Sequence, residues 1–438
     1  MAASGQGRTA PAGCYETAAG ARGRAAAPRR GRAVGAGVLA FAAVGCLLAP
    51  PSAAASAAGP PSPVPSPAVS PPPSPTPTAT PRTPVLPAPT GPYQVGATDL
   101  YLKDTSRPDP WVPEVKAREL MATVWYPASR KARGPKLPYL TPKESELHLK
   151  GARISGVPYD ILSGTRTHAI KDAAPVAGHE GRLPLVVLSP GFTKPRRTLT
   201  GLAEELASRG HIVVGVDHTY ESYATTFPDG RVATCVACET DEQPDHGPKT
   251  VAIRAADVSF VLDELTGKQP RWPGAALIDR SRIAMVGQSL GGASAVAAML
   301  GDSRVRAGID MDGTTYAPIP PGALSRPFML LGNQERHSPG SRDVSWDRDW
   351  RLMTGWKRWL VMSGAVHQSF TDVPILLEAL GLDSGAEVTG TRSLELTRRY
   401  VRAFLDRHLR GKRSPLLDEP SSRYPEMKIC APETGSCR

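Results

Sequence analysis

The fold is decided by one stretch, RIAMVGQSLGGASAVAAML, at residues 282–300 of this 438-residue chain. Its apolar first part predicts a buried strand, and its small-residue second part predicts a helix that begins at once. Between them stands GQSLG, residues 287–291, the one G-x-S-x-G match in the sequence. A strand that turns this sharply into a helix exposes the central serine and needs glycine on both sides. Ser289 is therefore the predicted nucleophile; the alternative is a glycine-rich turn without chemistry.

Short apolar runs and helical periods alternate along the rest of the chain. Besides residues 282–287, strands are predicted at 120–126, 183–189, 211–217, 305–311, 327–332 and 358–362. Their near-continuous apolar character is typical of parallel strands that are buried on both faces. Helices with one apolar face are predicted around 199–206, 251–262 and 394–405. This alternation predicts an α/β fold, a mostly parallel, doubly wound sheet with helices on both faces.

A serine nucleophile needs a base, and in such folds the order along the chain is serine, acid, histidine. Three histidines follow Ser289: His337, His367 and His408. His337 lies in a polar loop with nothing to fix it, and His408 is expected on the surface of the C-terminal helix. His367 follows the strand at 358–362, and an α/β sheet places its catalytic groups just past such strand ends. His367 is therefore the predicted base.

Three carboxylates compete for the role of orienting the histidine. Asp310 and Asp312 stand at the end of the strand predicted at 305–311, and Asp312 is the nearer to that end. Glu335 follows the next strand, where many serine hydrolases of this type have their acid. Composition and spacing leave the three nearly even.

Residues 1–58 have the composition of an export signal. A basic cluster at 29–32 precedes an apolar run of 17 residues at 33–49, and the small residues at 52–58 offer cleavage sites. The protein is therefore expected to be secreted. Because 17 apolar residues approach the length of a membrane span, a retained N-terminal membrane anchor is the alternative.

A proline-rich segment at 59–92 separates the signal from the rest of the chain. Residues 60–92 contain 15 of the 46 prolines, which predicts a disordered, extended linker. Residues 93–438 are the predicted catalytic domain. Of the net charge of +11, residues 1–90 carry +6, so the rest carries only +5 and has no basic run. No nucleic-acid partner is therefore expected.

Four cysteines lie beyond the linker in two close pairs. Cys235 and Cys238 form the first pair, and Cys430 and Cys437 form the second. A structural zinc site needs four ligands, and no second pair stands at the usual spacing, so disulfides are favoured over metal binding. Three pairings are possible, and loop closure favours one disulfide within each pair, the second of which would tie down the C-terminal tail.

Several stretches match one known family together. They are RELMATVWYPA (118–128), VVGVDHTYESYATTFPDGR (213–231), VLDEL (261–265), GQSLGGASA (287–295), GIDMDG (308–313) and GAVHQSF (364–370). Several of them have no generic reason to occur together. From residue 91 to about residue 409, the chain resembles the plasma-type platelet-activating factor acetylhydrolases and their bacterial relatives, within the α/β-hydrolase superfamily.

This resemblance implies a role for each catalytic candidate. Ser289 matches the nucleophile of the family and His367 matches its base. The acid that it implies is Asp312, after the strand that follows the serine helix. No metal ion and no organic cofactor is implied.

The resemblance also implies an oxyanion hole, made by the backbone N–H groups of Phe192 and Leu290. Where the vertebrate members of the family read H-G-L-G, this chain has PGFT at residues 190–193. The implied function is that of a secreted serine carboxylester hydrolase that cleaves short acyl esters, with phospholipid sn-2 acyl groups among them. The implied partner is a small-molecule or lipid ester, with transient contact to a lipid surface.

Two other functions remain open at this point. One is a broader lipase or esterase, including one that cleaves polyesters or polysaccharide esters, because a proline-rich spacer suits an enzyme that works outside the cell. The other is a non-catalytic surface-binding module on the same scaffold. An intact set of serine, acid and histidine argues against the second alternative.

Overall fold

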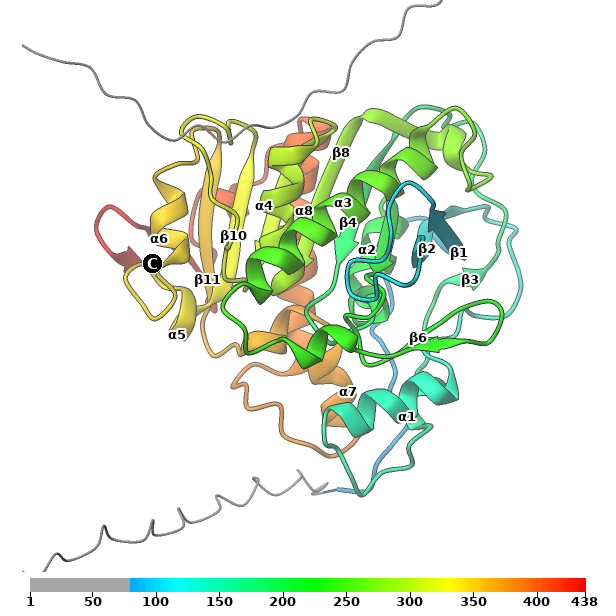
Figure 1. Cartoon of the computed structure of the whole chain (residues 1–438). Coiled ribbons are helices and arrows are strands. Elements are labelled where there is room, and N and C mark those ends of the chain that lie inside the picture. Colours follow the sequence, from blue (N-terminus) through cyan, green and yellow to red (C-terminus); the bar gives the residue numbers. More distant parts are fainter. Residues whose placement is uncertain (1–78) are drawn as a thin grey trace, which may run out of the picture. The chain divides into compact units, whose positions relative to one another are not determined.

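One eleven-stranded sheet is the frame of the computed structural model, which describes residues 79–438 (Figure 1). The predicted export signal at 1–58, with its apolar run, lies outside the described residues. Within residues 79–438, no helix has both the length and the apolar character that a membrane crossing needs.

The centre of the sheet is parallel, as the apolar runs predict. Its strands, in spatial order, are β5 (Ile212–Asp217), β4 (Leu183–Ser189), β8 (Ile278–Gln288), β9 (Val305–Met311), β10 (Phe328–Asn333) and β11 (Lys357–Met362). The chain therefore winds outward in both directions from β4 and β8, so that their carboxyl ends mark the switch point where such sheets carry their sites.

The edges of the sheet depart from the prediction, because β2 is antiparallel to β5. A continuous apolar sequence indicates a strand that is buried on both faces, but it does not indicate the direction of that strand. The strand predicted at 120–126 is therefore present, but it is antiparallel instead of parallel to its neighbour. The edge strands are β2 (Arg118–Ala128), β1 (Gln94–Asp104), β3 (Ile170–Lys171), β12 (Met427–Ala431) and β13 (Ser436–Cys437). A separate small ribbon pairs β6 (Thr225–Thr226) with β7 (Val232–Ala233).

Helices cover both faces of the sheet, which confirms the predicted layers (Figure 1). The two helices α3 (His246–Thr266) and α4 (Leu290–Gly301) pack on one face, and α2 (Thr200–Ser208) and α8 (Gly390–Arg410) pack on the other. Alternate residues of β4 point to the two sides: Leu185 joins the first core and Val186 the second.

The shorter helices lie in the connections between these elements. They are α1 (Pro142–Gly151), α5 (Gln334–His337), α6 (Ser345–Trp350) and α7 (Val373–Ala379). The single-turn 3₁₀ helices are η1 (Ile161–Gly164), η2 (Arg196–Leu199), η3 (Val236–Glu239), η4 (Ala275–Leu277), η5 (His367–Phe370) and η6 (Pro415–Leu417).

Residues 79–92 belong to the folded domain, so the linker predicted for 59–92 extends too far. Leu86 is 1% exposed, and its N–H donates to the carbonyl of Arg166 at 3.1 Å. The guanidinium of Arg398, on α8, donates to the carbonyls of Pro87 at 2.9 Å and Ala88 at 3.1 Å. Proline-rich backbone leaves its carbonyls unpaired, so they can accept hydrogen bonds from Arg398. These hydrogen bonds and the buried Leu86 side chain hold the segment against the domain.

Both predicted disulfides are present in the described residues. Cys235–Cys238 joins the residue before η3 to a residue within it, and Cys430–Cys437 joins β12 to β13. The C-terminal tail is therefore tied to the edge of the main sheet, as expected.

We expect the double substitution of Cys430 and Cys437 by alanine to lower the free energy of unfolding by at most about 2–3 kcal/mol, because a short loop removes little entropy from the unfolded chain. Urea denaturation of the wild type and the variant under non-reducing conditions measures this difference. Loss of the folded state would contradict the prediction.

Candidate active site

The turn at Ser289 has the strained geometry that the glycine spacing predicts. Ser289 joins β8 to α4 with φ 56° and ψ −127°, a conformation that residues other than glycine rarely adopt. A Cβ at Gly287 would lie 2.1 Å from the backbone of Gly291, and one at Gly291 would lie 2.0 Å from the carbonyl oxygen of Ser189. Both glycines are therefore required by close backbone approach, and strain of this kind is typical of functional sites.

Asp312 and His367 meet beside this turn, although 55 residues separate them. His367 Nδ1 lies 2.6 Å from Asp312 Oδ2, and the His367 side chain is 40% exposed whereas that of Asp312 is fully buried. Burial opposes ionisation of Asp312, but the hydrogen bond from His367 and the nearby His337 ring hold its pKa below the usual value. Asp312 is thus a carboxylate that can fix the tautomer of His367.

The other two carboxylates lie elsewhere. The Glu335 side chain is 80% exposed and pairs with Arg342 at 3.6 Å. Asp310 is fully buried and accepts a hydrogen bond from the Gly313 N–H at 2.9 Å. Burial raises the pKa of Asp310 well above its usual value, which favours the uncharged carboxyl at this position.

Asn333 is a site residue that the sequence reasoning missed. Its backbone N–H and its side-chain Nδ2 both donate to Asp312 Oδ1, at 2.6 and 2.8 Å, and Nδ2 also lies 2.9 Å from Oδ2. Asn333 ends β10, the strand next to β9, so this contact depends on strand neighbours that a single sequence does not specify.

Two histidines lie in surroundings that differ from the predictions. His337 is fully buried, stacks on Trp346 with ring centroids 4.1 Å apart, and places Nε2 3.7 Å from Asp312 Oδ1. The prediction of an unfixed polar loop fails because an aromatic partner buries the ring. His408 packs on Trp356 at 4.4 Å and is half-buried instead of lying on the surface.

Gln288 links the nucleophile turn to the histidine loop. Its Nε2 donates to the His367 carbonyl at 3.0 Å and lies 3.4 Å from His367 Nε2. Within residues 79–438, the Ser289 hydroxyl makes no hydrogen bond. The structure therefore joins His367 to Asp312 and places the serine turn alongside, without a Ser289–His367 hydrogen bond.

The loop after β4 brings Phe192 close to the nucleophile. A Cβ at Gly191 would lie 3.3 Å from Ser289 Cβ, so this loop touches the serine turn. Leu290 is the first residue of α4, where backbone N–H groups have no intrahelical partner. Neither the Phe192 nor the Leu290 N–H donates to another group of the described chain. Both donors expected for an oxyanion hole are thus available.

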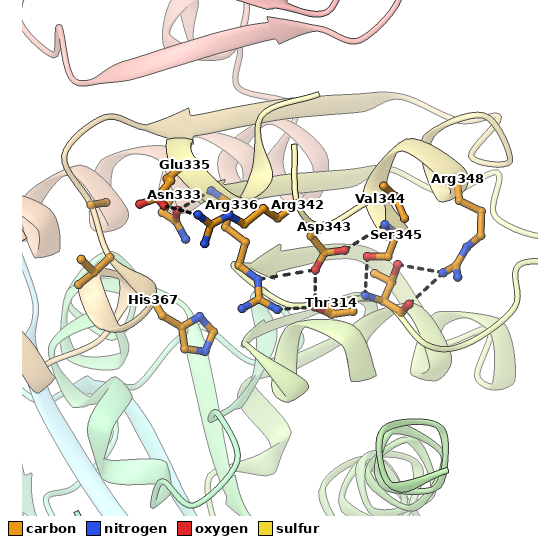
Figure 2. Close-up of a pocket in the computed structure, with 13 residues that line it drawn as sticks. Thr314, Asn333, Glu335, Arg336, Arg342, Asp343, Val344, Ser345, Arg348 and His367 are labelled. Carbon is orange, nitrogen blue, oxygen red and sulfur yellow. Dashed lines mark hydrogen bonds and ion pairs between the residues drawn. The ribbon is translucent and has the colours of Figure 1, made fainter. Parts of the chain in front are cut away.

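A polar pocket of about 680 Å³ opens beside His367. Figure 2 shows His367 at one end of the pocket and Arg348 at the other, with Arg336 and Arg342 between them. On the oxyanion side, by contrast, the Phe192 ring meets His246 edge to face at 4.8 Å, and Trp111 lies 5.7 Å from the same His246 ring. One side of the site therefore carries three arginines, each paired with a carboxylate (Arg336 with Asp343, Arg342 with Glu335 and Arg348 with Asp349), and the other side is aromatic.

A buried carboxyl group fixes the histidine loop from behind. Asp372 N–H donates to the Thr198 carbonyl at 2.8 Å, and Asp372 Oδ1 accepts from the Gly201 N–H in the first turn of α2 at 3.0 Å. Burial raises the pKa of Asp372 to about 8.

Asp372→Asn should stabilise the protein more at pH 9 than at pH 5. A carboxyl whose folded pKa is raised stabilises the fold when protonated, and this contribution is lost as the pH rises from its ordinary value near 4 to about 8. The amide keeps the acceptor for Gly201 and has no charge to bury, so the expected gain at pH 9 is a few kcal/mol. Urea denaturation at the two pH values tests this; an equal effect at both would contradict it.

Comparison with known proteins identifies the family of the chain. The family model described as platelet-activating factor acetylhydrolase, isoform II, matches residues 79–242 and 275–415. A probable 1-alkyl-2-acetylglycerophosphocholine esterase of Arthroderma benhamiae is 27% identical over 375 residues, covering 78% of this chain and 93% of that protein. The platelet-activating factor acetylhydrolase of Cavia porcellus is 24% identical and covers 74% of this chain and 78% of its own length.

Among solved structures, the ferulic acid esterase from Streptomyces cinnamoneus matches with a TM-score of 0.71 and 42% sequence identity. The match covers 80% of this chain and 100% of that one. The predicted α/β-hydrolase fold and the predicted family resemblance are both confirmed. The chain therefore belongs to the platelet-activating factor acetylhydrolase isoform II family.

Proposed function

We propose that this protein is a secreted serine carboxylester hydrolase that cleaves short acyl esters. The observation that carries the proposal is the 2.6 Å contact between His367 and buried Asp312, beside a serine held at φ 56°. The curated relatives support it, since their names describe esterases and acetylhydrolases.

In the proposed reaction, His367 takes the Ser289 proton as the hydroxyl oxygen attacks the ester carbonyl carbon. Asp312 keeps the imidazole tautomer and stabilises its positive charge. The tetrahedral oxyanion accepts hydrogen bonds from the N–H groups of Phe192 and Leu290. The C–O bond of the ester breaks, His367 returns its proton to the leaving alcohol, and water then hydrolyses the acyl-serine by the same steps.

The leaving alcohol must face His367, which protonates it, and the arginine-lined pocket opens on that side. Guanidinium groups bind phosphate and carboxylate well. An alcohol that carries a phosphate, as the glycerophospholipid headgroup in the relatives' names does, fits this side of the site. Transient contact with a lipid surface would deliver such a substrate.

A second candidate is an ester of a hydroxycinnamic acid. The aromatic wall of Phe192, His246 and Trp111 offers a stacking surface for a planar acyl group, and the structural neighbour at 42% identity is a ferulic acid esterase. This candidate shares the nucleophile and the mechanism and differs only in the acyl group.

Turnover of p-nitrophenyl esters from acetate to palmitate, of methyl ferulate and of a short-acyl phospholipid separates these candidates. We expect acetate and the short-acyl phospholipid to have the highest kcat/KM; a preference for ferulate favours the second candidate. Fluorophosphonate labelling of Ser289 is expected in either case. A folded protein that neither hydrolyses these esters nor becomes labelled would favour a surface-binding module.

Export is a separate part of the proposal. N-terminal sequencing of protein from the culture medium is expected to show cleavage at or near residues 52–58. Protein that remains in the membrane with its apolar run intact would favour the anchored alternative.

A further inference from the structure

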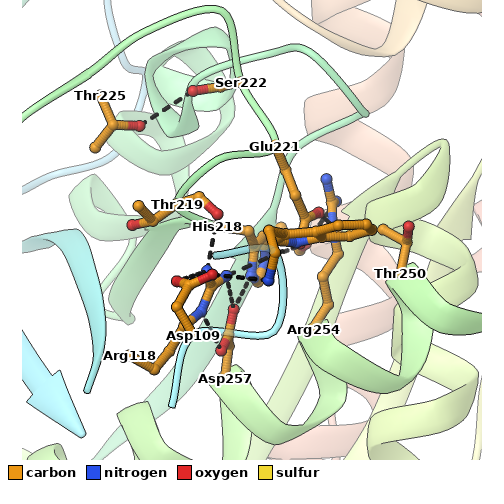
Figure 3. Close-up of polar contacts among 12 residues, drawn as sticks. Asp109, Arg118, His218, Thr219, Glu221, Ser222, Thr225, Thr250, Arg254 and Asp257 are labelled. Atoms are coloured by element: carbon orange, nitrogen blue, oxygen red, sulfur yellow. Dashed lines mark hydrogen bonds and ion pairs between the residues drawn. The ribbon is translucent and has the colours of Figure 1, made fainter. Parts of the chain in front are cut away.

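A buried cluster of charged side chains (Figure 3) contacts the loop that carries Phe192 through a hydrogen bond from Arg254 to the Pro190 carbonyl. The cluster consists of Asp109, Arg118, His218, Glu221, Arg254 and Asp257, each at most 2% exposed. The proposed reaction uses none of these groups. Burying these charges is costly even though they are paired, because the desolvation penalty can exceed the energy gained from the ion pairs. The cluster is therefore expected to have a role besides stability.

Arg254 connects this cluster to the oxyanion loop, which we define as residues 190–193. From α3, its guanidinium donates to the carbonyl of Pro190 and, through Nε, to Glu221 Oε2 at 2.6 Å. Glu221 also accepts a hydrogen bond from Trp111 Nε1 at 3.0 Å. The direction of the guanidinium is therefore fixed from two sides, and with it the direction of the Pro190 carbonyl.

The oxyanion loop is also held at Thr193, the residue after Phe192. The Thr193 N–H donates to the Glu221 carbonyl at 2.9 Å, and the Thr193 carbonyl accepts from the Tyr223 N–H at 3.2 Å. Thr193 has φ 66°, a strained conformation for a β-branched residue. These contacts leave the Phe192 N–H as a free donor beside Ser289.

A second Ser–His–Asp chain anchors the strand that enters this loop. Ser189 Oγ lies 2.9 Å from His218 Nε2, and His218 Nδ1 lies 2.9 Å from Asp257 Oδ2. Burial lowers the pKa of His218, so the neutral ring accepts from the hydroxyl and donates to the carboxylate. Ser189 is fully buried at the end of β4, which denies a substrate access to it.

We propose that Arg254 is a positioning residue for the oxyanion hole. By fixing the Pro190 carbonyl, it sets the peptide planes that aim the Phe192 N–H at the developing oxyanion. This inference rests on the proposed function. Loss of one oxyanion donor costs about 10²–10³-fold in kcat, and a misplacement of about 1 Å costs about 10²-fold, so a misdirected Phe192 N–H should lower kcat by roughly 10- to 100-fold.

Arg118 supplies a matched control for a purely structural role. It is also fully buried, and it donates to Asp109 at 2.8 Å, to Asp257 at 2.8 Å and to the Thr219 carbonyl at 2.8 Å. Arg118 contacts no residue of the oxyanion loop among its hydrogen bonds within residues 79–438. It approaches Glu221 only as an ion pair at 3.9 Å, beyond hydrogen-bond distance, whereas Arg254 donates to Glu221 at 2.6 Å. Arg118→Lys should therefore disturb the charge cluster while leaving the Pro190 carbonyl in place.

The test compares Arg254→Lys with Arg118→Lys on p-nitrophenyl acetate, with kcat expressed per serine titrated by a fluorophosphonate. We expect Arg254→Lys to lower kcat by about 10- to 100-fold with KM within about twofold, as a transition-state effect requires. A trifluoromethyl ketone, whose adduct with serine carries an oxyanion, should bind more weakly by the same factor as the loss in kcat/KM. Arg118→Lys should keep kcat per site within about threefold, although its Tm falls.

Glu221→Gln is the second variant, because it keeps the side-chain volume and removes the charge that orients Arg254; a loss of kcat in the same direction is expected. Unchanged kcat per titrated serine in Arg254→Lys or, where that variant does not fold, in Glu221→Gln would overturn the inference. Equal losses in Arg254→Lys and Arg118→Lys would also overturn it. Failure of the wild type to hydrolyse esters would instead refute the proposed function.

Discussion

Ser289→Ala should lower esterase turnover by at least about 10⁴-fold while the protein stays folded. A triad acts as a unit, so removing the nucleophile leaves only binding and oxyanion stabilisation of the uncatalysed reaction. The small side chain is easily accommodated at a half-buried turn whose backbone is fixed by the Ser289 N–H to the Met311 carbonyl at 2.8 Å. Initial rates on p-nitrophenyl acetate measure the loss.

Ser189→Ala is the matched comparison, because Ser189 also contacts a histidine but is buried. Fluorophosphonate labelling followed by peptide mass spectrometry should find the adduct on Ser289 in the wild type and in Ser189→Ala, and none in Ser289→Ala. Near-wild-type activity of folded Ser289→Ala would end the proposed function.

Asp312→Asn should lower kcat by roughly 10⁴-fold, the scale expected when the base loses its correct tautomer. The amide of asparagine can donate to His367 Nδ1, which stabilises the tautomer whose proton is on Nε2. In that tautomer Nε2 cannot accept the proton of the serine hydroxyl. The rates of the wild type and the variants should be compared on p-nitrophenyl acetate at the same pH.

The two competing carboxylates are the controls for this prediction. Glu335→Gln should change turnover only slightly, because that side chain is 80% exposed and pairs with Arg342. Asp310 is buried and bonds to the Gly313 N–H instead of His367, so we expect Asp310→Asn to act mainly on stability. A large loss in Glu335→Gln together with a tolerant Asp312→Asn would contradict the assignment and leave the fold unaffected.

The sequence was most informative where backbone geometry restricts the residue type. A Cβ at Gly287 or Gly291 would collide with backbone atoms, so the spacing of these glycines around Ser289 predicts the turn without any knowledge of the rest of the structure. The central strands were predictable for a similar reason, since burial on both faces demands continuous apolar runs. Strand direction leaves no such signal, which is why the sequence does not predict that β2 is antiparallel to β5.

Contacts between charged side chains were not predictable in this way. Nothing in the sequence around Arg254 and Glu221 distinguishes them from charged residues on the surface. Only the packing of α3 against the loop after β5 shows that they are buried together. Asn333 and His337 likewise gain their roles from strand order and from stacking on Trp346. The acid illustrates both limits: spacing left Asp310, Asp312 and Glu335 nearly even, whereas the family resemblance pointed to the residue that contacts His367.

The segment at residues 79–92 has a consequence for the order of folding. Its carbonyls are held by Arg398, about 310 positions later in the chain. A contact of such high sequence separation closes only after almost the whole domain has been synthesised, and contacts of this kind slow folding. Nascent chains that lack α8 can form only the other contacts of this segment, such as that of Leu86 with Arg166, and should therefore be more sensitive to protease at residues 79–92 than the complete domain.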